Sequence, residues 1–161
     1  MSFERSVEQF LFRKAALCDG RKWTEYIALF DEDCELHLPQ WDSEHEYTTD
    51  PRTGLSLLYY RDRSGLEDRV FRINTGRSAA SEPMPRTQHL ISNIQVGALE
   101  AGLVDVRVNW NTFVYRFSTT NHFYGFAEYR LRQADGVLTI KRKHAVLLND
   151  TINEVLDFYH L

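Results

Sequence analysis

Residues 104–114, Val-Asp-Val-Arg-Val-Asn-Trp-Asn-Thr-Phe-Val, alternate apolar and polar side chains along most of their length. This period of two predicts a β-strand with one buried face, because successive side chains of a strand point to opposite sides of its sheet. Phe113, Tyr115 and Phe117 are apolar on the opposite face. We therefore expect burial to change sides near residue 112, through a bend, a bulge or cover on both faces.

The same alternation extends to both sides of this strand. One further strand is expected upstream at residues 90–96, and two more downstream at 122–132 and 137–148. Asp135-Gly136 joins the last two, and this dipeptide suits the positive φ angles of a tight hairpin turn. The second half of the chain therefore predicts a long antiparallel meander.

The first half shows the periodicity of helices. Apolar stripes predict helices over residues 6–18, 23–30 and 64–75. The first and third open with the spacing of a capping box, and Asp19-Gly20 and Gly76 are their expected stops. Short extended segments are expected at 34–38 and 55–60. Helices on one face of an antiparallel sheet define an α+β fold, and without a linker or repeat in the sequence we expect one domain over residues 1–161.

The composition excludes several classes of protein. The 161 residues carry 19 Lys and Arg against 23 Asp and Glu, a net charge of −4, which argues against a polybasic nucleic-acid binder. The longest apolar run, residues 26–30, is far shorter than the about 20 residues that span a bilayer. Two cysteines cannot build a disulfide framework, and the first residues do not resemble a signal peptide. We expect a soluble, cytoplasmic protein that binds neither nucleic acid nor membrane.

Six histidines are present, but their spacing does not predict a metal site. Two Asp-x-x-His fragments, at 42–45 and 157–160, each resemble half of a 2-His-1-carboxylate triad, yet neither has a second histidine close behind it. A Rieske cluster needs two cysteines and two histidines. Here Cys18 falls in a helix while Cys34 starts a strand. We therefore expect no metal ligand, no cofactor and no catalytic residue in this chain.

Two other groups of residues leave alternatives open. A curved sheet backed by helices can enclose a cavity, and an acid/base site would form there if four side chains converged. These are His89, His122, Tyr124 and Asp42. Strand or loop placement explains each of them without catalysis. The arginines between residues 61 and 86 suit a protein interface that presents carboxylates, a solvated helix face or a small-anion site.

The segment of residues 40–63 is long for a loop inside one domain, and loops of this length are usually functional. It carries Trp41, Tyr59 and Tyr60. Aromatic residues in such a segment either fold back on the core or anchor an interface. We expect an interface for this loop and docking on the core for the aromatic pair at residues 158–159.

Several stretches are distinctive when taken together. They are residues 39–51, 65–73, 75–80, 85–87, 89–94 and 152–160. With the specific Leu-Glu-Asp-Arg-Val block at 66–70, they resemble the small (β) subunits of aromatic-ring-hydroxylating dioxygenases over essentially the whole chain. Around residues 41–45 the sequence is most similar to the anthranilate branch of that family, followed by the benzoate and toluate branches.

The resemblance implies a nuclear-transport-factor-2-like (cystatin-like) cone, in which helices pack on a curved antiparallel sheet. It also implies a hexamer of three large and three small subunits (α3β3), with contacts between small subunits. In this family the large subunit holds the Rieske [2Fe-2S] cluster and the mononuclear Fe(II), and a separate reductase supplies electrons from NADH. The small subunit holds no cofactor and is mainly structural.

For this chain, the resemblance implies a non-catalytic subunit of an enzyme that inserts both atoms of O2 into an aromatic carboxylate. The reaction would convert anthranilate to catechol, or the substrate would be benzoate or toluate. We expect the interface residues to be Trp41, Tyr59, Tyr60, Glu67, Asp68, Arg69 and Arg72. The alternative is a free-standing dehydratase or isomerase of the same cone fold that uses a cavity His/Asp pair.

Overall fold

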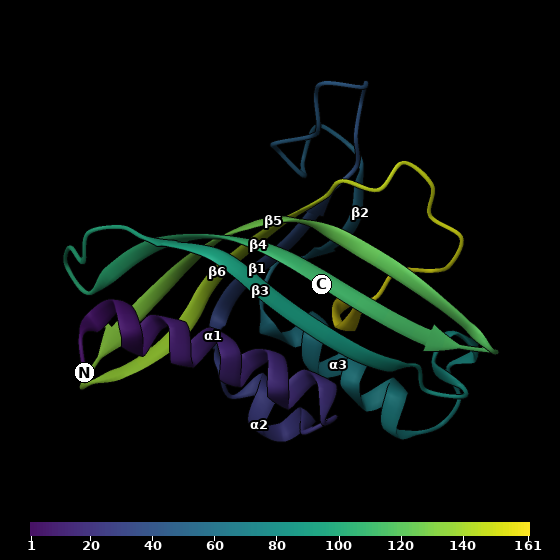
Figure 1. Ribbon diagram of the computed structural model, residues 1–161, viewed down its shortest axis with the longest axis horizontal. Helices are drawn as coiled ribbons and strands as arrows, with labels where there is room; N and C mark the ends of the chain where they lie inside the picture. Colours follow the sequence, from purple (N-terminus) through teal and green to yellow (C-terminus); the bar gives the residue numbers. More distant parts are fainter.

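The computed structural model describes residues 1–161, apart from the side chain of Ala80. The helices are α1 (Phe3–Asp19), α2 (Trp23–Ile27) and α3 (Arg63–Asn74), with short 3-10 turns η1 (Ala79–Ser81) and η2 (Phe158–His160). The strands are β1 (Phe30–Pro39), β2 (Ser56–Tyr60), β3 (Arg86–Val96), β4 (Leu103–Arg116), β5 (Thr119–Ala134) and β6 (Val137–Leu147). The strands form one sheet in the order β2-β1-β6-β5-β4-β3, and the helices lie against one side of it (Figure 1).

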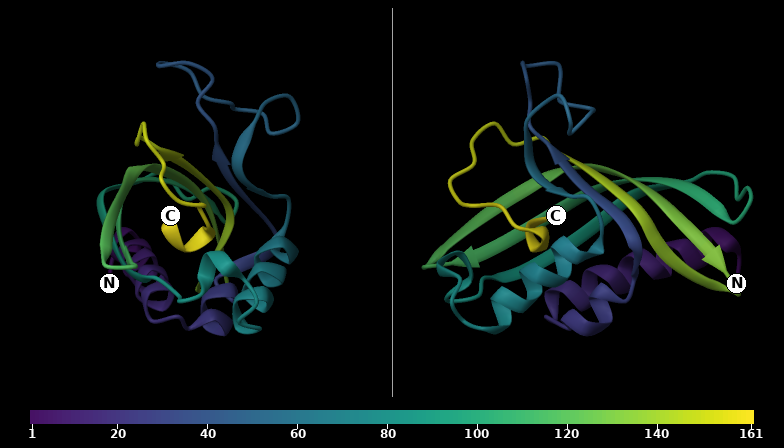
Figure 2. Two further views of the ribbon diagram at one scale, coloured as in Figure 1. Left: turned by 90° about the vertical axis from the view of Figure 1, so that its right-hand side faces the viewer. Right: turned by 180° about the vertical axis from the view of Figure 1, so that it is seen from behind.

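The sheet curls over the helices so that the two layers enclose a cone-shaped interior (Figure 2). Strands β3 to β6 pair antiparallel in sequence order, as the meander predicts. Strand β1 pairs antiparallel with β2 and parallel with β6. The predicted α+β fold, with helices on a curved antiparallel sheet, is therefore confirmed, while the parallel pair was not predicted.

Strand β4 pairs with β5 in continuous register over its 14 residues. Its side chains at even positions from Val104 to Val114 are buried, so the same face looks inward along the whole strand. The expected bend or bulge near residue 112 is wrong, because the register with β5 is continuous there. Phe113 and Tyr115 lie on the outer face, about 40% exposed, and the Phe113 ring stacks on His122 with ring centroids 4.6 Å apart. Cover by a neighbouring ring on the outer face explains the apolar pattern there.

Helices α1 and α3 begin earlier than the capping-box spacing predicts. Ser2 caps α1, and Asp62 caps α3 by accepting a hydrogen bond from the Ser64 N–H at 2.9 Å. The Ser6 hydroxyl instead donates to the carbonyl of Phe3 at 2.6 Å. A side chain caps a helix only where the chain turns into it, and residue spacing does not mark that point.

The sequence predicted the chain reversals at three glycine positions more accurately than it predicted the helix starts. Helix α1 ends at Asp19 with Gly20 as its cap, and α3 is followed by Gly76, whose φ of +66° suits a helix end. Asp135 and Gly136 have φ angles of +52° and +76° between β5 and β6. These positive angles confirm the predicted hairpin turn.

The C-terminal segment (residues 148–161) turns back from β6 and places η2 inside the cone (Figure 2). Phe158 and Tyr159 are each 1% exposed, which confirms that this aromatic pair docks on the core. The Phe158 ring packs edge-on against Trp23 at 5.3 Å and lies 5.8 Å from the ring of Tyr26, measured between centroids. Because each buried aromatic side chain removes about 200 Å² from water, the segment contributes substantially to the core.

An ion pair fixes the C-terminal segment to α3. Arg69 donates from Nε to Asp157, and its Nη2 donates to the hydroxyls of Ser78 and Ser81 at 3.0 and 2.9 Å. Asp157 also accepts a hydrogen bond from the backbone N–H of Phe158 at 2.9 Å. The Asp157 side chain is 7% exposed and that of Arg69 is 16% exposed. Each charge is therefore compensated mainly by groups of this chain.

Replacing Asp157 with Ala should destabilise the fold by about 3 kcal/mol, because the variant leaves the Arg69 guanidinium largely buried without its carboxylate. Asp105→Ala is the control, since Asp105 pairs with Arg130 at 2.8 Å on the exposed surface. Such a pair contributes less than about 1 kcal/mol. Urea unfolding of both variants measures the difference. Equal losses of unfolding free energy would contradict the anchoring role of Asp157.

Candidate functional site

Asp19 and His89 form a polar pair between the end of α1 and β3. His89 Nδ1 lies 2.5 Å from Asp19 Oδ1, and the backbone N–H of His89 donates to Oδ2 of the same carboxylate at 3.0 Å. Burial lowers the pKa of His89. Partial burial opposes ionisation of Asp19, but hydrogen bonds from His89 and Thr87 hold the pKa of its carboxyl below the usual value. The pair is therefore a carboxylate beside a neutral imidazole, and it ties the helix layer to the sheet.

The acid/base site that the sequence left open as an alternative does not form, because its four residues do not converge. They are His89, His122, Tyr124 and Asp42. Along β5 the side chains alternate, and Phe123 points inward at 3% exposure, so His122 and Tyr124 lie on the outer face. Asp42 lies in the loop between β1 and β2.

Asp19 is the partner of His89 that sequence analysis missed. It follows the apolar stripe of the first helix, where Asp-Gly indicates a helix stop, and 70 residues separate it from His89. Only the packing of α1 on β3 brings the two together. No local spacing in the sequence could have revealed this pair.

The interior beside α1 is basic. Lys14 and Lys143 are each 2% exposed, and both Nζ atoms lie 5.7 Å from the ring centre of Tyr129. Burial, together with the charge of Lys14, lowers the pKa of Lys143 well below its usual value. Burial raises the pKa of the Cys18 and Cys34 thiols to about 12, so both remain protonated. Amines and protonated thiols are a poor environment for a metal cation.

Among the residues whose side chains are described, no three His, Cys, Asp or Glu side chains gather in an arrangement that could hold a metal ion. The fragment at residues 157–160 has a structural use. The Asp157 N–H donates to His160 Nδ1 at 2.8 Å, which completes the cap of η2. The described residues therefore do not fit a Rieske cluster or a 2-His-1-carboxylate iron site. In addition, no described helix is both long and apolar enough to cross a membrane.

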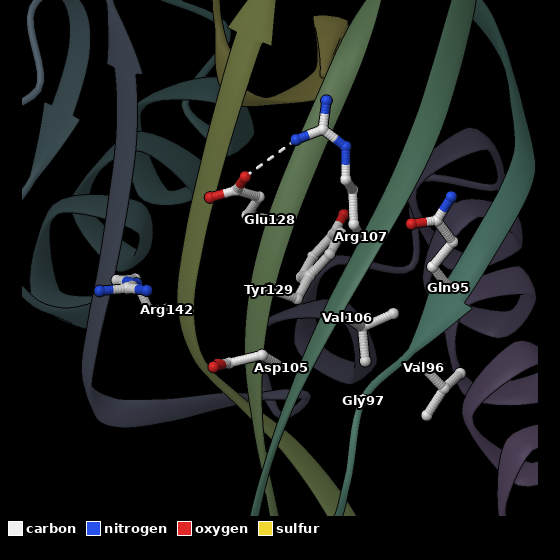
Figure 3. A pocket seen from close by; sticks show the side chains of 9 residues that line it. All are labelled: Gln95, Val96, Gly97, Asp105, Val106, Arg107, Glu128, Tyr129 and Arg142. Atoms are coloured by element: carbon white, nitrogen blue, oxygen red, sulfur yellow. Dashed lines mark hydrogen bonds and ion pairs between the residues drawn. The ribbon is translucent and has the colours of Figure 1, made fainter.

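A hollow of about 520 Å³ opens on the outer face of the sheet near the end of β3 (Figure 3). Gly97 closes one side of it by donating its N–H to the carbonyl of Asp105 at 2.9 Å. Arg107 pairs with Glu128 at 3.0 Å across the hollow, and Arg142 lines it as well. Charges of both signs on an exposed surface are typical of the rim of a protein contact.

Three of the predicted interface residues are engaged within the chain. Trp41 donates its indole N–H to the carbonyl of Leu147 at 2.7 Å. The Tyr60 ring fills the space beside Gly65, where an added Cβ would lie 2.5 Å from it. Arg69 holds the C-terminal segment, as described above.

The other predicted interface residues are on the surface. Tyr59 is 37% exposed, and Asp68 and Arg72 are exposed on α3. Glu67 is also exposed, although its carboxylate accepts a hydrogen bond from Arg63 at 2.7 Å. The interface role of all seven residues stays a prediction.

Two histidines stack on the outer face beneath the loop between β1 and β2. The rings of His37 and His144 are 4.9 Å apart between centroids and nearly parallel, at 8°. His37 Nε2 lies 2.9 Å from the hydroxyl of Ser56, and Tyr47 of the loop packs edge-on against His144 at 6.3 Å. Burial lowers the pKa of both histidines, and the charge of His144 lowers that of His37 further. The folded chain therefore favours the neutral form of this stack.

The chain matches known proteins along almost its whole length. A family model described as "Ring hydroxylating beta subunit" matches residues 13–154. The small subunit of anthranilate 1,2-dioxygenase from Acinetobacter baylyi is 54% identical over 156 residues, which cover 97% of this chain and 96% of that protein.

Solved structures agree with the fold. The β subunit of benzoate 1,2-dioxygenase from Burkholderia mallei is 34% identical, with a TM-score of 0.81 and coverage of 96% of this chain and 95% of that one. A proposed scytalone dehydratase from Novosphingobium aromaticivorans has a TM-score of 0.67 at 19% identity, covering 96% of this chain and 91% of that one. At that identity the likeness shows only the shared cone fold, of the nuclear-transport-factor-2-like type.

The histidine stack should make the fold sensitive to acid. Because the pKa of both rings is lowered on folding, their contribution to stability is complete above the usual histidine pKa of 6.5 and is lost as the pH falls below it. His144→Phe keeps a ring in place but cannot be protonated. We expect chemical unfolding at pH 7 and pH 5 to show a smaller acid-induced loss of stability in this variant than in the natural chain. The control is His45→Phe in the exposed loop, and an equal change in the two variants would refute the assignment.

Proposed function

The chain belongs to the ring-hydroxylating β-subunit family, and from this membership we propose that it is the non-catalytic small subunit of an anthranilate 1,2-dioxygenase. The observation that carries the proposal is the 54% identity to the anthranilate 1,2-dioxygenase small subunit over nearly the whole of both chains. The 34% identical relative of known structure is named for benzoate, which is also an aromatic carboxylate. This agreement supports the substrate class.

The structural role is supported by how the chain uses its own interior. Phe158 and Tyr159 occupy the cone, and Arg69 fixes them there through Asp157. The hydrogen bonds between Asp19 and His89 join α1 to β3. The chain, acting as one domain over residues 1–161, contributes shape and contact area to its complex.

In the proposed complex the redox centres belong to the large subunit. A Rieske [2Fe-2S] cluster and a mononuclear Fe(II) there would supply electron transfer and O2 activation. Three large and three small subunits would form an α3β3 hexamer in the cytoplasm, with contacts between small subunits, and a reductase would pass electrons from NADH. Both oxygen atoms would enter the ring of anthranilate as a cis-diol, and loss of ammonia and CO2 would leave catechol, in the breakdown of aromatic compounds.

A dehydratase or isomerase of the same fold is the second candidate. The observation that favours it is the Asp19–His89 pair, in which Nε2 of the buried imidazole has no hydrogen-bond partner among the described residues. Such a nitrogen could act as a general base if a substrate reached it. The observation against it is that Phe158, Tyr159 and His160 take up interior space, each at 1% exposure.

Co-expression with the large subunit of the same organism tests the first candidate. We expect the two chains to purify together and, with reductase and NADH, to consume O2 in the presence of anthranilate and release catechol. The purified small subunit alone should hold no stoichiometric iron and consume no O2. An oxygen electrode, iron analysis and product chromatography check these outcomes.

Two results would count against this function. Stoichiometric iron bound by the isolated chain would place redox chemistry in the wrong subunit. Turnover of a hydroxylated substrate by the isolated chain, lost in His89→Gln and retained in His122→Gln, would favour the dehydratase. His122 is the matched control because it lies on the outer face, where its Nε2 lies 2.9 Å from Oδ1 of Asn111.

A further inference from the structure

The loop of residues 40–55, here called the arm, stands away from the sheet between β1 and β2 (Figures 1 and 2). Its base is held by the hydrogen bond of Trp41 to Leu147 at 2.7 Å and by edge-on packing of the Trp41 and Tyr47 rings at 5.1 Å. The backbone N–H of Gln40 donates to the carbonyl of Leu55 at 3.2 Å, which closes the two ends of the arm on each other. A segment that is ordered in advance loses less conformational freedom when it docks on a partner.

The tip of the arm is acidic and internally ordered. The Asp42 N–H donates to the carbonyl of Glu46 at 2.8 Å, and the Thr48 hydroxyl, in a residue that is 5% exposed, donates to the Asp42 carboxylate at 3.3 Å. Glu44 and Glu46 are exposed, and among the described side chains neither has an ion-pair partner. The arm thus presents two free carboxylates on a structured turn.

Helix α3 presents the complementary chemistry on the other side of the molecule. Phe71 is 69% exposed, and Arg72 follows it on the exposed surface. Arg77 is exposed shortly after the helix ends. Within the described part of the chain neither arginine has a carboxylate partner, whereas Arg63 and Arg69 are paired. Asp68 is also exposed on α3, but no ion pair joins it to Arg72 among the described residues. Aromatic residues and arginine are enriched in protein interfaces, which makes these exposed side chains candidates for one.

We propose that the acidic arm of one copy of this chain docks on the Phe71–Arg72–Arg77 face of a second copy. The inference rests on the proposed function, since it assigns a contact between small subunits of the complex. The arm and α3 lie on opposite sides of the sheet, so the two surfaces do not meet within one chain (Figure 1). One contact between two copies would pair the carboxylates of the arm with the arginines of the α3 face. A contact that joins two different faces repeats from copy to copy, and it closes into a ring when the rotation between copies permits.

A charge exchange tests the contact in the full-length chain. The arm variant Glu44→Arg/Glu46→Arg and the helix variant Arg72→Glu/Arg77→Glu should each weaken self-association at least about tenfold, because each places like charges together. The chain that carries all four changes should regain self-association, since its charges are complementary again. Sedimentation equilibrium over a range of protein concentrations measures the association constant.

The matched control for the arm variant is Glu25→Arg/Glu100→Arg, which makes the same change of net charge as that variant at exposed positions on α2 and in the β3–β4 turn. Self-association at the natural strength is expected for it. A natural chain that stays monomeric throughout, or a fourfold variant as weak as the two double variants, would overturn the proposed contact.

Capture of the large subunit by each variant separates this inference from the proposed function. Variants that fail to self-associate are expected still to bind the large subunit, because the inference assigns the changed charges to the contact between small subunits. Loss of large-subunit capture with self-association unchanged would assign the arm to the large subunit and refute the inference alone. Failure of the natural chain to capture the large subunit would refute the proposed function, whatever the sedimentation results.

Discussion

The ion pair between Arg69 and Asp157 is the constraint on which the rest of the structure depends. The C-terminal segment places Phe158 and Tyr159 in the interior between the curved sheet and the three helices, where each is 1% exposed. That segment carries little regular structure, so its position must be fixed by specific contacts. Arg69 provides them by pairing with Asp157 and by donating to the hydroxyls of η1. The buried charge is tolerated in this place because the Asp157 carboxylate compensates it and because both Nε and Nη2 of Arg69 have hydrogen-bond partners.

This arrangement explains how a fold that can enclose a catalytic cavity serves here as a structural subunit. Fold does not determine function, and the groups inside a fold must be examined for what they are free to do. In this chain Asp19 and His89 join helix to strand, and Lys14 and Lys143 lie against Tyr129. Membership of the ring-hydroxylating β-subunit family agrees with an interior that is devoted to holding the cone together.

The elements of this fold could be predicted where the determining interactions are local. Alternation along β4 follows from the pleat of a strand, and the Asp135-Gly136 turn follows from backbone conformation, so both were found correctly. The burial of Phe113 was predicted wrongly because the sequence does not distinguish an apolar residue on the outer face of a sheet from one in the core. The ion pair of Arg69 was not predicted, because Arg69 lies beside Leu66 and Val70 on the buried side of α3 and its partner is 88 residues away. Contacts of that range depend on packing that no local pattern encodes.

The residues that are exposed on the surface of the chain determine which contacts can stabilise its assembly with other chains. The ionisable groups in the interior of this chain are buried and are either paired or held neutral. They are therefore not available for contacts with another chain. The outer surface is different, because Phe71, Phe113 and Tyr124 expose between 39% and 69% of their area. Burial of such aromatic surface gives affinity, whereas the charges around it select the partner and its orientation. A subunit whose interior groups contact one another, and whose aromatic residues are partly exposed on the surface, therefore acts through the surfaces it buries against other chains.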